Sequence, residues 1–269
     1  MKIFIPTKNR QDIQHTAKKL AEAGIEAVYV IDENDSPPID PPFEFIRINC
    51  TGINNIRQAI VKLSDDNKIC MMDDDLSFFV RDNTEVVDLR MIKPFEIVDM
   101  IQWLDEALNE YAHASISART QNFQCTYRLQ KANVFTLETV RPYRIYGFDK
   151  SIIEGEKLEF GAGLKINIQD DFHITLELLE LGYPNIVNFK YAHEQRGSNS
   201  RGGAATYRDL ELLERCALNL KQHHPEVVKL VKKKTINSWR GSPENPVFRT
   251  DVIIQWQKAL GLRSSKSRL

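Results

Sequence analysis

The chain has 269 residues, with 36 Lys and Arg against 37 Asp and Glu, and a formal net charge of −1. Hydrophobic residues make up 42% of the chain and charged residues 27%. This balance excludes an intrinsically disordered protein, because such chains are too polar to bury a core. The near-zero net charge also excludes a uniformly basic protein that coats nucleic acid.

Short apolar strands alternate with helices in the N-terminal part of the chain. Apolar runs predict strands at residues 3–5, 27–31, 43–48 and 68–72. Apolar residues spaced three and four apart predict helices between them at residues 12–23 and 54–63. This alternation predicts an α/β fold, in which βαβ units build a mostly parallel sheet. In such sheets ligands bind beyond the carboxyl ends of the strands.

The remaining elements are less regular. We expect strands at residues 115–119, 126–129, 134–137 and 186–192, a helix at residues 94–111, and a helix that follows Asp170 and Asp171 and ends at residue 181. Residues 195–206 lack apolar periodicity and are interpreted as a loop. Further helices are predicted at residues 207–222, 225–234 and 250–260. We therefore assign residues 1–206 to one α/β domain and residues 207–269 to a helical, basic extension packed on it.

The charge is unevenly distributed along the chain. Residues 228–269 contain ten Lys and Arg against two acidic residues, a formal charge of +8, which leaves −9 for residues 1–227. A basic end on an acidic body indicates either a polyanionic partner or a solvated helix face with a frayed tail. Just before this segment, His223 and His224 adjoin Pro225 and are interpreted as the end of a helix.

The cysteines and apolar runs bear on location. The four cysteines are widely scattered and form no Cys-x-x-Cys pair: Cys50, Cys70, Cys125 and Cys216. They are interpreted as reduced thiols. The first apolar run ends at Pro6, too early for a signal peptide, and no run reaches the roughly 18–20 residues of a membrane span. We expect a soluble, cytoplasmic protein that is a monomer or a small homo-oligomer.

Three consecutive carboxylates, Asp73, Asp74 and Asp75, follow the apolar strand at residues 68–72. Alternate positions of an extended chain point the same way, so Asp73 and Asp75 are expected to converge while Asp74 faces elsewhere. Two like charges held close together are unfavourable unless a cation lies between them. Mg²⁺ and Mn²⁺ prefer carboxylate and phosphate oxygens, so the pattern favours a divalent metal site. The alternative is an acidic surface turn.

The motifs around this strand resemble those of the GT-A glycosyltransferases. They are Ile-Pro-Thr-Lys-Asn-Arg at residues 5–10, the acidic turn at 32–35, Gly-Ile-Asn-Asn-Ile-Arg at 52–57 and Met-Met-Asp-Asp-Asp at 71–75. The resemblance implies a Rossmann-like αβα sandwich in which a D-x-D motif binds Mn²⁺ or Mg²⁺ and the diphosphate of a nucleotide-sugar. It implies Asp73 and Asp75 as metal ligands. It also implies nucleotide contacts from Thr7, Arg10, Asp32, Arg57, Asp73 and Asp74, although each could instead be a helix cap or a surface charge.

A second motif, Asp170 and Asp171 before an apolar helix, is similar to the acidic pair of inverting GT-A enzymes. Transfer to a hydroxyl group requires a base within hydrogen-bonding reach of the nucleophile. The resemblance implies that one of the two carboxylates is this base, and Asp171 is favoured because it lies nearer the helix start. The alternative is a helix N-cap with a favourable interaction with the helix dipole.

His193 and two arginines complete the predicted site. In several GT-A families a histidine at this point completes the metal shell, and a neutral imidazole is a competent ligand. A structural hydrogen bond of His193 is the alternative. Arg196 and Arg201 lie among glycines, in a segment that is expected either to close over the donor phosphates or to form a plain surface loop.

A narrower resemblance concerns the acceptor. The size of the chain, the motifs at residues 5–10 and 71–75 and a late His-x-x-x-Gly…Gly-Gly segment resemble the phage-encoded TET-associated glycosyltransferases. Those enzymes are taken to add sugars to 5-hydroxymethylpyrimidines in DNA. The resemblance implies an inverting transfer from a UDP-sugar in the cytoplasm of the phage's host. The basic segment would then contact DNA phosphates, and the target base would be flipped out or otherwise accessible.

Two other functions remain open. A glycosyltransferase of polysaccharide or lipid-linked glycans often carries an amphipathic membrane-binding helix, and residues 227–234 are a candidate for one. A nucleotidyltransferase, or a non-catalytic nucleotide-binding protein, could use a similar sheet. A nucleotidyltransferase is expected to carry a Gly-rich phosphate loop after the first strand, and the loop here contains no glycine.

Overall fold

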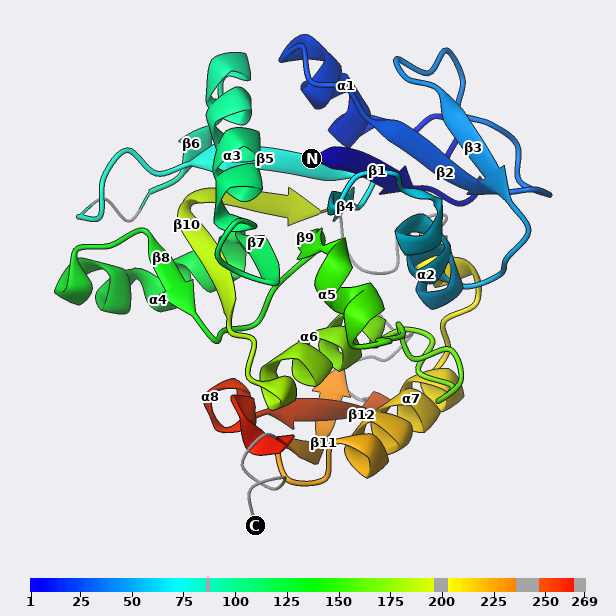
Figure 1. Cartoon of the computed structure of the whole chain (residues 1–269), viewed down its shortest axis with the longest axis vertical. Coiled ribbons are helices and arrows are strands. Elements are labelled where there is room, and N and C mark those ends of the chain that lie inside the picture. Colours follow the sequence, from blue (N-terminus) through cyan, green and yellow to red (C-terminus); the bar gives the residue numbers. More distant parts are fainter. Residues whose placement is uncertain (86–87, 196–202, 236–246, 264–269) are drawn as a thin grey trace.

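A ten-stranded sheet with helices on both faces forms the centre of the protein (Figure 1). The computed structural model describes residues 1–85, 88–195, 203–235 and 247–263. In order across the sheet, the strands are β3 (Phe45–Ile48), β2 (Val28–Asp32), β1 (Lys2–Pro6), β4 (Lys68–Met72), β9 (Ile145–Asp149), β7 (His113–Ala118), β10 (Asn185–Gln195), β5 (Leu76–Val80) and β6 (Arg90–Met91), while β8 (Thr136–Glu138) pairs with β10.

Most strands of this sheet run in one direction. β3, β2, β1 and β4 are parallel neighbours, and β7 pairs in parallel with β10. β9 is antiparallel to both β4 and β7, so these two parallel groups point the same way. β5 and β8 are antiparallel to β10. The predicted α/β class and mostly parallel sheet are therefore confirmed.

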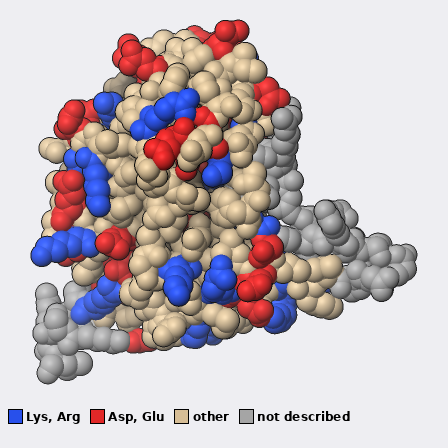
Figure 2. All heavy atoms as spheres, turned by 90° about the vertical axis from the view of Figure 1, so that its right-hand side faces the viewer, with Lys and Arg blue, Asp and Glu red and all other residues tan. Residues whose placement is uncertain are grey.

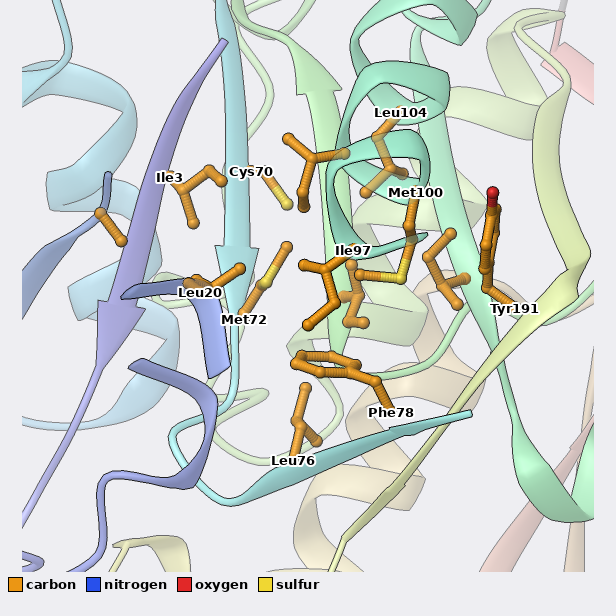
Figure 3. Packing of buried hydrophobic residues seen from close by; sticks show 14 of the residues in the cluster. Ile3, Leu20, Cys70, Met72, Leu76, Phe78, Ile97, Met100, Leu104 and Tyr191 are labelled. Carbon is orange, nitrogen blue, oxygen red and sulfur yellow. The ribbon is translucent and has the colours of Figure 1, made fainter. Parts of the chain in front are cut away.

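The central strands are buried on both faces, because successive side chains of a strand point to opposite sides. Ile3 belongs to the core under α1 (His15–Glu22) and α3 (Pro94–Ala107), whereas Phe4 belongs to the core under α2 (Ile53–Leu63), α5 (Lys150–Gly155) and α6 (Asp170–Leu181). Figure 3 shows the first of these cores, where Met100 of α3 and Met72 of β4 share one apolar layer. The three layers form an αβα sandwich.

The region beyond residue 206 is only partly helical, which corrects the prediction for it. The helix predicted at residues 207–222 is present as α7 (Leu210–His223). The predicted helices at 225–234 and 250–260 are wrong, because the chain forms β11 (Val228–Thr235), β12 (Val247–Ile254) and the short α8 (Trp256–Ala259) there. β11 and β12 pair antiparallel. Their β-branched residues favour strands, and short apolar runs do not distinguish strand from helix.

This C-terminal unit, the described residues 207–235 and 247–263, packs on α6 on the side away from the sheet (Figure 1). Leu176 and Leu179 of α6 share a buried cluster with Leu220 of α7, Val228 of β11 and Val252 of β12. Residues 228–234 therefore belong to a strand of a packed sheet, and residues 227–234 form no amphipathic helix. In the described part of the chain, no helix combines the length and the apolar character that crossing a membrane requires.

The strand predicted at residues 126–129 is also wrong, because these residues lie within α4 (Arg119–Ala132). Asn122 of α4 is buried and donates hydrogen bonds to the Ser117 hydroxyl at 2.9 Å and the Phe189 carbonyl at 2.7 Å. A helix that buries polar side chains shows no clear apolar stripe in its sequence. Thr126 and Tyr127 have strand propensity, which the packing of α4 overrides.

Candidate active site

A cavity of about 510 Å³ lies where the carboxyl ends of β1 and β4 meet the N-terminal ends of α2 and α6. This volume is typical of a small-molecule site, and this edge of the sheet is where α/β proteins bind ligands. Eight Lys and Arg side chains and five Asp side chains line the cavity. The cavity is therefore suited to an anionic ligand that also carries a cation.

The three consecutive aspartates do not form an extended strand, because Asp74 and Asp75 form a turn between β4 and β5. Arg10 Nη1 donates hydrogen bonds to Asp74 Oδ1 at 2.5 Å and to Asp75 Oδ2 at 3.0 Å. Thr7 Oγ1 donates to Asp74 Oδ2 at 2.5 Å. The prediction that Asp74 faces away from its neighbours is wrong, since strand alternation does not hold in a turn. A cation does lie between two of the carboxylates, and it is the guanidinium of Arg10.

Arg57, at the start of α2, joins Asp73 to the acidic pair. Its Nη1 donates to Asp170 Oδ2 at 2.6 Å, and its Nη2 lies 3.7 Å from Asp73 Oδ1. The guanidinium lies 4.7 Å from the centre of the Tyr146 ring, and the Tyr146 hydroxyl donates to Asp171 Oδ2 at 3.0 Å. Burial alone would lower the pKa of Arg57, but Asp170 raises it above its ordinary value. One buried cation thus connects α2, the end of β4 and the start of α6.

The two carboxylates at the start of α6 have different surroundings. Asp170 is 2% exposed, and burial raises its pKa to about 6 against the opposing effect of Arg57. Asp171 is partly exposed, lines the cavity and accepts the hydrogen bond from Tyr146. The N-cap of α6 is Gln169, so neither aspartate is the cap, although both lie in the first turn. Asp170 holds Arg57, and Asp171 presents its carboxylate to the cavity.

Asp73 and Asp75 retain oxygens that a cation can use. Asp73 lines the cavity with 27% of its side chain exposed, and burial raises its pKa while Arg57 and Arg144 oppose this. Asp75 Oδ1 is buried, and no described residue forms a hydrogen bond with it. Carboxylate oxygens of this kind fit a hard divalent cation. Asp73 and Asp75 are therefore the residues that would hold one.

His193 lies in β10 and is fully buried. Its Nε2 lies 3.0 Å from the carbonyl oxygen of Tyr143, and burial lowers its pKa to about 3. Within the described residues, no hydrogen bond joins His193 to Asp73 or Asp75, so its observed contact matches the structural alternative. Gln195, two residues further along β10, donates instead to Asp75 Oδ2 at 3.2 Å. No motif in the sequence indicated that Gln195 contacts the aspartate turn.

The other predicted nucleotide contacts separate into two groups. Thr7, Arg10, Arg57, Asp73 and Asp74 all line the cavity. Asp32 ends β2 outside the cavity lining, and its Oδ1 accepts a hydrogen bond from the backbone N–H of the residue two positions later at 3.0 Å. Arg196 and Arg201 lie outside the described residues.

Residues 141–146 form one wall of the cavity, which was not predicted from the sequence. Arg144 adopts φ = +47°, a conformation that costs energy for a residue with a side chain and is found preferentially at functional sites. Its carbonyl accepts the backbone N–H of Asp73 at 3.2 Å, and its Nε lies 4.0 Å from Asp73 Oδ2. The Arg141 guanidinium lies 4.2 Å from the ring centre of Tyr143 and 4.4 Å from that of Phe172. The Arg-Pro-Tyr-Arg-Ile-Tyr pattern of this segment is the sequence signal that could have indicated it.

The C-terminal unit supplies a second cationic wall. Lys233 of β11 and Arg249 of β12 both line the cavity, and both approach Asp251 Oδ2, at 2.9 and 3.3 Å. Other basic residues of the unit are neutralised on the surface, as in the 2.8 Å ion pair between Lys232 and Glu214. Figure 2 shows the face of the molecule that lies on the right in Figure 1, and cationic and anionic side chains are interspersed on it. The described part of the basic end is therefore a contributor to the cavity and not a continuous basic surface.

Replacing Arg57 with Met is expected to leave Asp170 as an unpaired buried carboxylate, and to lower the free energy of unfolding by about 3–5 kcal/mol near neutral pH. The pKa of Asp170 is already about 6, and loss of the cation raises it further. A carboxyl group with a folded pKa above its unfolded pKa destabilises the protein as pH rises between the two values. Urea unfolding in a chelating buffer should therefore show a smaller penalty at about pH 5 than at about pH 7.

The matched control for this experiment is Arg215→Met, which removes an arginine from the exposed side of α7. Surface substitutions of this kind change stability by about 0.5 kcal/mol or less. An Arg57→Met penalty that is equal at both pH values would contradict the pairing with Asp170.

Comparison with known proteins identifies phage enzymes as relatives. No protein-family model matches the sequence. The chain is 26% identical over 187 residues to the beta-glucosyl-HMC-alpha-glucosyl-transferases of Enterobacteria phages T2 and T6. In each case the match covers 65% of this chain and 62% of the relative, so the chain spans less than two thirds of the relatives' length.

The solved structures similar to this chain include two complexes with UDP. TarS of S. aureus in complex with UDP has a TM-score of 0.49 and 13% identity, covering 82% of this chain and 66% of that one. Glucosyl-3-phosphoglycerate synthase of Mycobacterium tuberculosis, in complex with Mn²⁺, UDP and phosphoglyceric acid, has a TM-score of 0.47 and 9% identity, covering 94% and 86%. The sequence comparison confirms the expected similarity of this chain to phage-encoded glycosyltransferases.

Proposed function

We propose that this chain is a glycosyltransferase that moves a sugar from a UDP-sugar to the hydroxymethyl group of modified pyrimidines in DNA, with inversion at the transferred carbon. The observation that carries the proposal is the cavity in which Asp73 and Asp171 are connected through Arg57 and Tyr146. The similarity to phage enzymes named beta-glucosyl-HMC-alpha-glucosyl-transferases supports glycosyl transfer and an acceptor that contains HMC.

The diphosphate of the donor is bound at the start of α2. Gly52, the N-cap of this helix, lines the cavity and has no side chain that could cap the first turn. Free N–H groups at a helix N-terminus bind phosphate oxygens. Gly52 has φ = +92°, and a Cβ there would lie 2.9 Å from Asn54 Oδ1, so this turn requires glycine. Arg10 and Arg144 add charge-assisted donors at the same edge of the cavity.

Asp73 and Asp75 would hold the divalent cation, Mn²⁺ or Mg²⁺. When bound, the ion supplies positive charge that stabilises the departing diphosphate. Arg10 keeps Asp74 and the second oxygen of Asp75 in place, which leaves Asp75 Oδ1 for the ion. The cationic side chains of the cavity serve the same leaving group through direct hydrogen bonds.

Asp171 is the base. It removes the proton from the acceptor hydroxyl while that oxygen forms a bond to the anomeric carbon of the sugar. The bond between this carbon and the diphosphate oxygen breaks, and UDP leaves with the electron pair. A single displacement of this kind inverts the configuration. The Tyr146 hydroxyl orients the Asp171 carboxylate, and Asp170 keeps Arg57 in place beneath it.

DNA reaches the cavity along the C-terminal unit. Lys233 and Arg249 lie at the cavity, where they contact backbone phosphates. Arg141, Tyr143 and Phe172 form a stack of planar groups on which a flipped base can rest. A glycan acceptor is less well supported, because the segment considered for a membrane-binding helix, residues 227–234, is a strand from residue 228 onward.

Donor binding is expected to depend on the divalent ion and on the aspartate turn. Asp73→Asn and Asp75→Asn should each abolish the Mn²⁺-dependent part of UDP-sugar binding, because each removes an anionic oxygen from the ion. Isothermal titration calorimetry with and without Mn²⁺ measures this. Asp65→Asn, which changes an exposed carboxylate, is the matched control. Unchanged affinity in the two site variants would refute the assignment of the metal ligands.

We expect the loss of the Asp171 carboxylate to reduce the rate of sugar transfer but not the affinity for the donor. The protein is incubated with hydroxymethylated DNA and a panel of nucleotide-sugars, and the DNA is digested to nucleosides for mass spectrometry. Asp171→Asn should lower the transfer rate by about 10²–10⁴-fold, because the base is lost, while UDP-sugar affinity is retained. If Asp171→Asn stays active and Asp170→Asn does not, the base is Asp170. No added hexose or pentose from any donor would reject DNA as the acceptor.

DNA affinity is expected to fall when the cavity cations of the C-terminal unit are removed. Lys233→Gln and Arg249→Gln should each weaken binding equally for modified and unmodified DNA, and should each reduce the slope of log affinity against log salt by about 1. Fluorescence anisotropy over a salt series measures both effects. Lys18→Gln on the exposed side of α1 should leave the slope unchanged. Equal slopes in all variants would place the DNA elsewhere.

A further inference from the structure

A group of histidines and a glutamate lies between α6 and α7, outside the cavity lining described above. His173 and Glu177 are four residues apart on α6, so they share one side of the helix. His223 is the last residue of α7, and His224 is its C-cap. One nitrogen or oxygen atom from each of the four residues lies within 4.8 Å of the others. His173, Glu177 and His224 are buried, and 34% of the His223 side chain is exposed.

The spacing of these atoms matches a tetrahedral metal site. His173 Nδ1 lies 3.0 Å from His224 Nε2, and His223 Nε2 lies 2.9 Å from Glu177 Oε1. His224 Nε2 lies 3.8 Å from the same Glu177 oxygen. In a tetrahedral Zn²⁺ site with bonds of about 2.0–2.1 Å, the ligand atoms lie roughly 3.3 Å apart. Small shifts of the side chains therefore bring all four atoms to ligating distance.

The hydrogen bond between His224 and Glu180 also suits a metal. His224 Nδ1 lies 2.8 Å from Glu180 Oε1, and because a carboxylate only accepts, Nδ1 carries the proton. The other nitrogen, Nε2, then faces the cluster. A carboxylate that orients a histidine in this way is typical of metal sites.

Arg263 completes the surroundings of the cluster. Its Nη1 donates to Glu177 Oε2 at 2.8 Å, its Nη2 to Glu177 Oε1 at 2.5 Å, and its Nε lies 2.8 Å from Glu180 Oε2. Two buried carboxylates thus share one guanidinium. Their excess negative charge favours the binding of a further cation. A metal on Glu177 Oε1 replaces one of the two bonds from Arg263 to Glu177, while Glu177 Oε2 and Glu180 keep Arg263 in place.

We propose that His173 Nδ1, Glu177 Oε1, His223 Nε2 and His224 Nε2 form a Zn²⁺ site. Three imidazoles and one carboxylate favour Zn²⁺ over Mg²⁺ or Mn²⁺, which prefer oxygen ligands. Four protein ligands leave no open position, so the site is structural. It clamps the end of α7, and with it the wall formed by β11 and β12, to the helix that begins with Asp170 and Asp171. The site does not depend on the proposed transferase activity.

The test measures metal content and stability of the whole chain. The protein is stripped with a chelator, dialysed against Zn²⁺ and analysed by plasma mass spectrometry. The expected result is about one Zn²⁺ per chain, a higher thermal unfolding midpoint with Zn²⁺ than without, and visible absorption typical of tetrahedral coordination after replacement by Co²⁺. Absence of retained Zn²⁺ would overturn the proposal.

Variants separate this site from the carboxylates of the cavity. His223→Asn, at the partly exposed ligand, should lose Zn²⁺ and the gain in thermal midpoint while keeping the circular dichroism of the metal-free protein. Glu180→Gln should weaken Zn²⁺ binding by about 10–100-fold, because it removes the group that orients His224. His15→Asn, at an exposed histidine of α1, and Asp73→Asn should retain Zn²⁺. Zn²⁺ kept by His223→Asn, or lost by Asp73→Asn, would show that the ion binds elsewhere.

Discussion

The buried guanidinium of Arg57 is the interaction on which the site depends. Removing a cation and its partner carboxylates from water costs several kcal/mol for each ion, and only close, well-oriented pairing offsets that cost. Asp170 gives such pairing at 2.6 Å, and the Tyr146 ring covers the guanidinium. Arg57 is in the first turns of α2, where the helix dipole disfavours a cation, whereas Asp170 is in the first turn of α6, where the dipole favours an anion. The pair therefore fixes the two helix starts relative to each other and holds Asp73 at the cavity.

The local pattern of apolar and polar residues was sufficient to predict several strands and helices of the central sheet. The continuous burial of β1 and β4 and the acidic groups at strand and helix ends follow from apolar runs and the polar residues that end them. These elements, with Asp73 after β4 and Asp171 at the start of α6, were therefore predicted correctly. The pairing of Arg10 with Asp74 and Asp75 was not, because it depends on a turn whose geometry no run of three aspartates specifies. The antiparallel insertion of β9 between β4 and β7 is set by contacts far apart in the chain, and it is this strand that brings Tyr146 to Asp171.

The basic C-terminal segment shows why charge totals are weak guides to a surface. Its formal excess of cations left two interpretations open, a polyanionic partner or a solvated helix face with a frayed tail. Among the described residues, Lys232 and Arg263 are paired with Glu214 and Glu177, which screens them from solvent partners, whereas Lys233 and Arg249 share the single carboxylate of Asp251. The two that matter for the site, Lys233 and Arg249, lie in adjacent strands and reach the cavity because β11 and β12 form a sheet. The helices predicted from the apolar spacing would not place these two residues side by side. The wrong secondary structure is therefore also the reason why the sequence did not predict this wall of the cavity.

Helix α6 connects the two halves of the molecule mechanically. Ile174 and Leu178 pack toward the central sheet, whereas Leu176 and Leu179 pack toward the C-terminal unit. A helix buried on both sides moves only if both cores repack, and close-packed cores resist this. Asp171 in its first turn is therefore held at a fixed place between the wall of the cavity built by β1, β4 and α2 and the cationic wall built by β11 and β12. In the proposed reaction, the distance between a donor on the first wall and an acceptor on the second is set by the packing of this helix, so the proposed base on α6 needs no closing motion of its own to meet both.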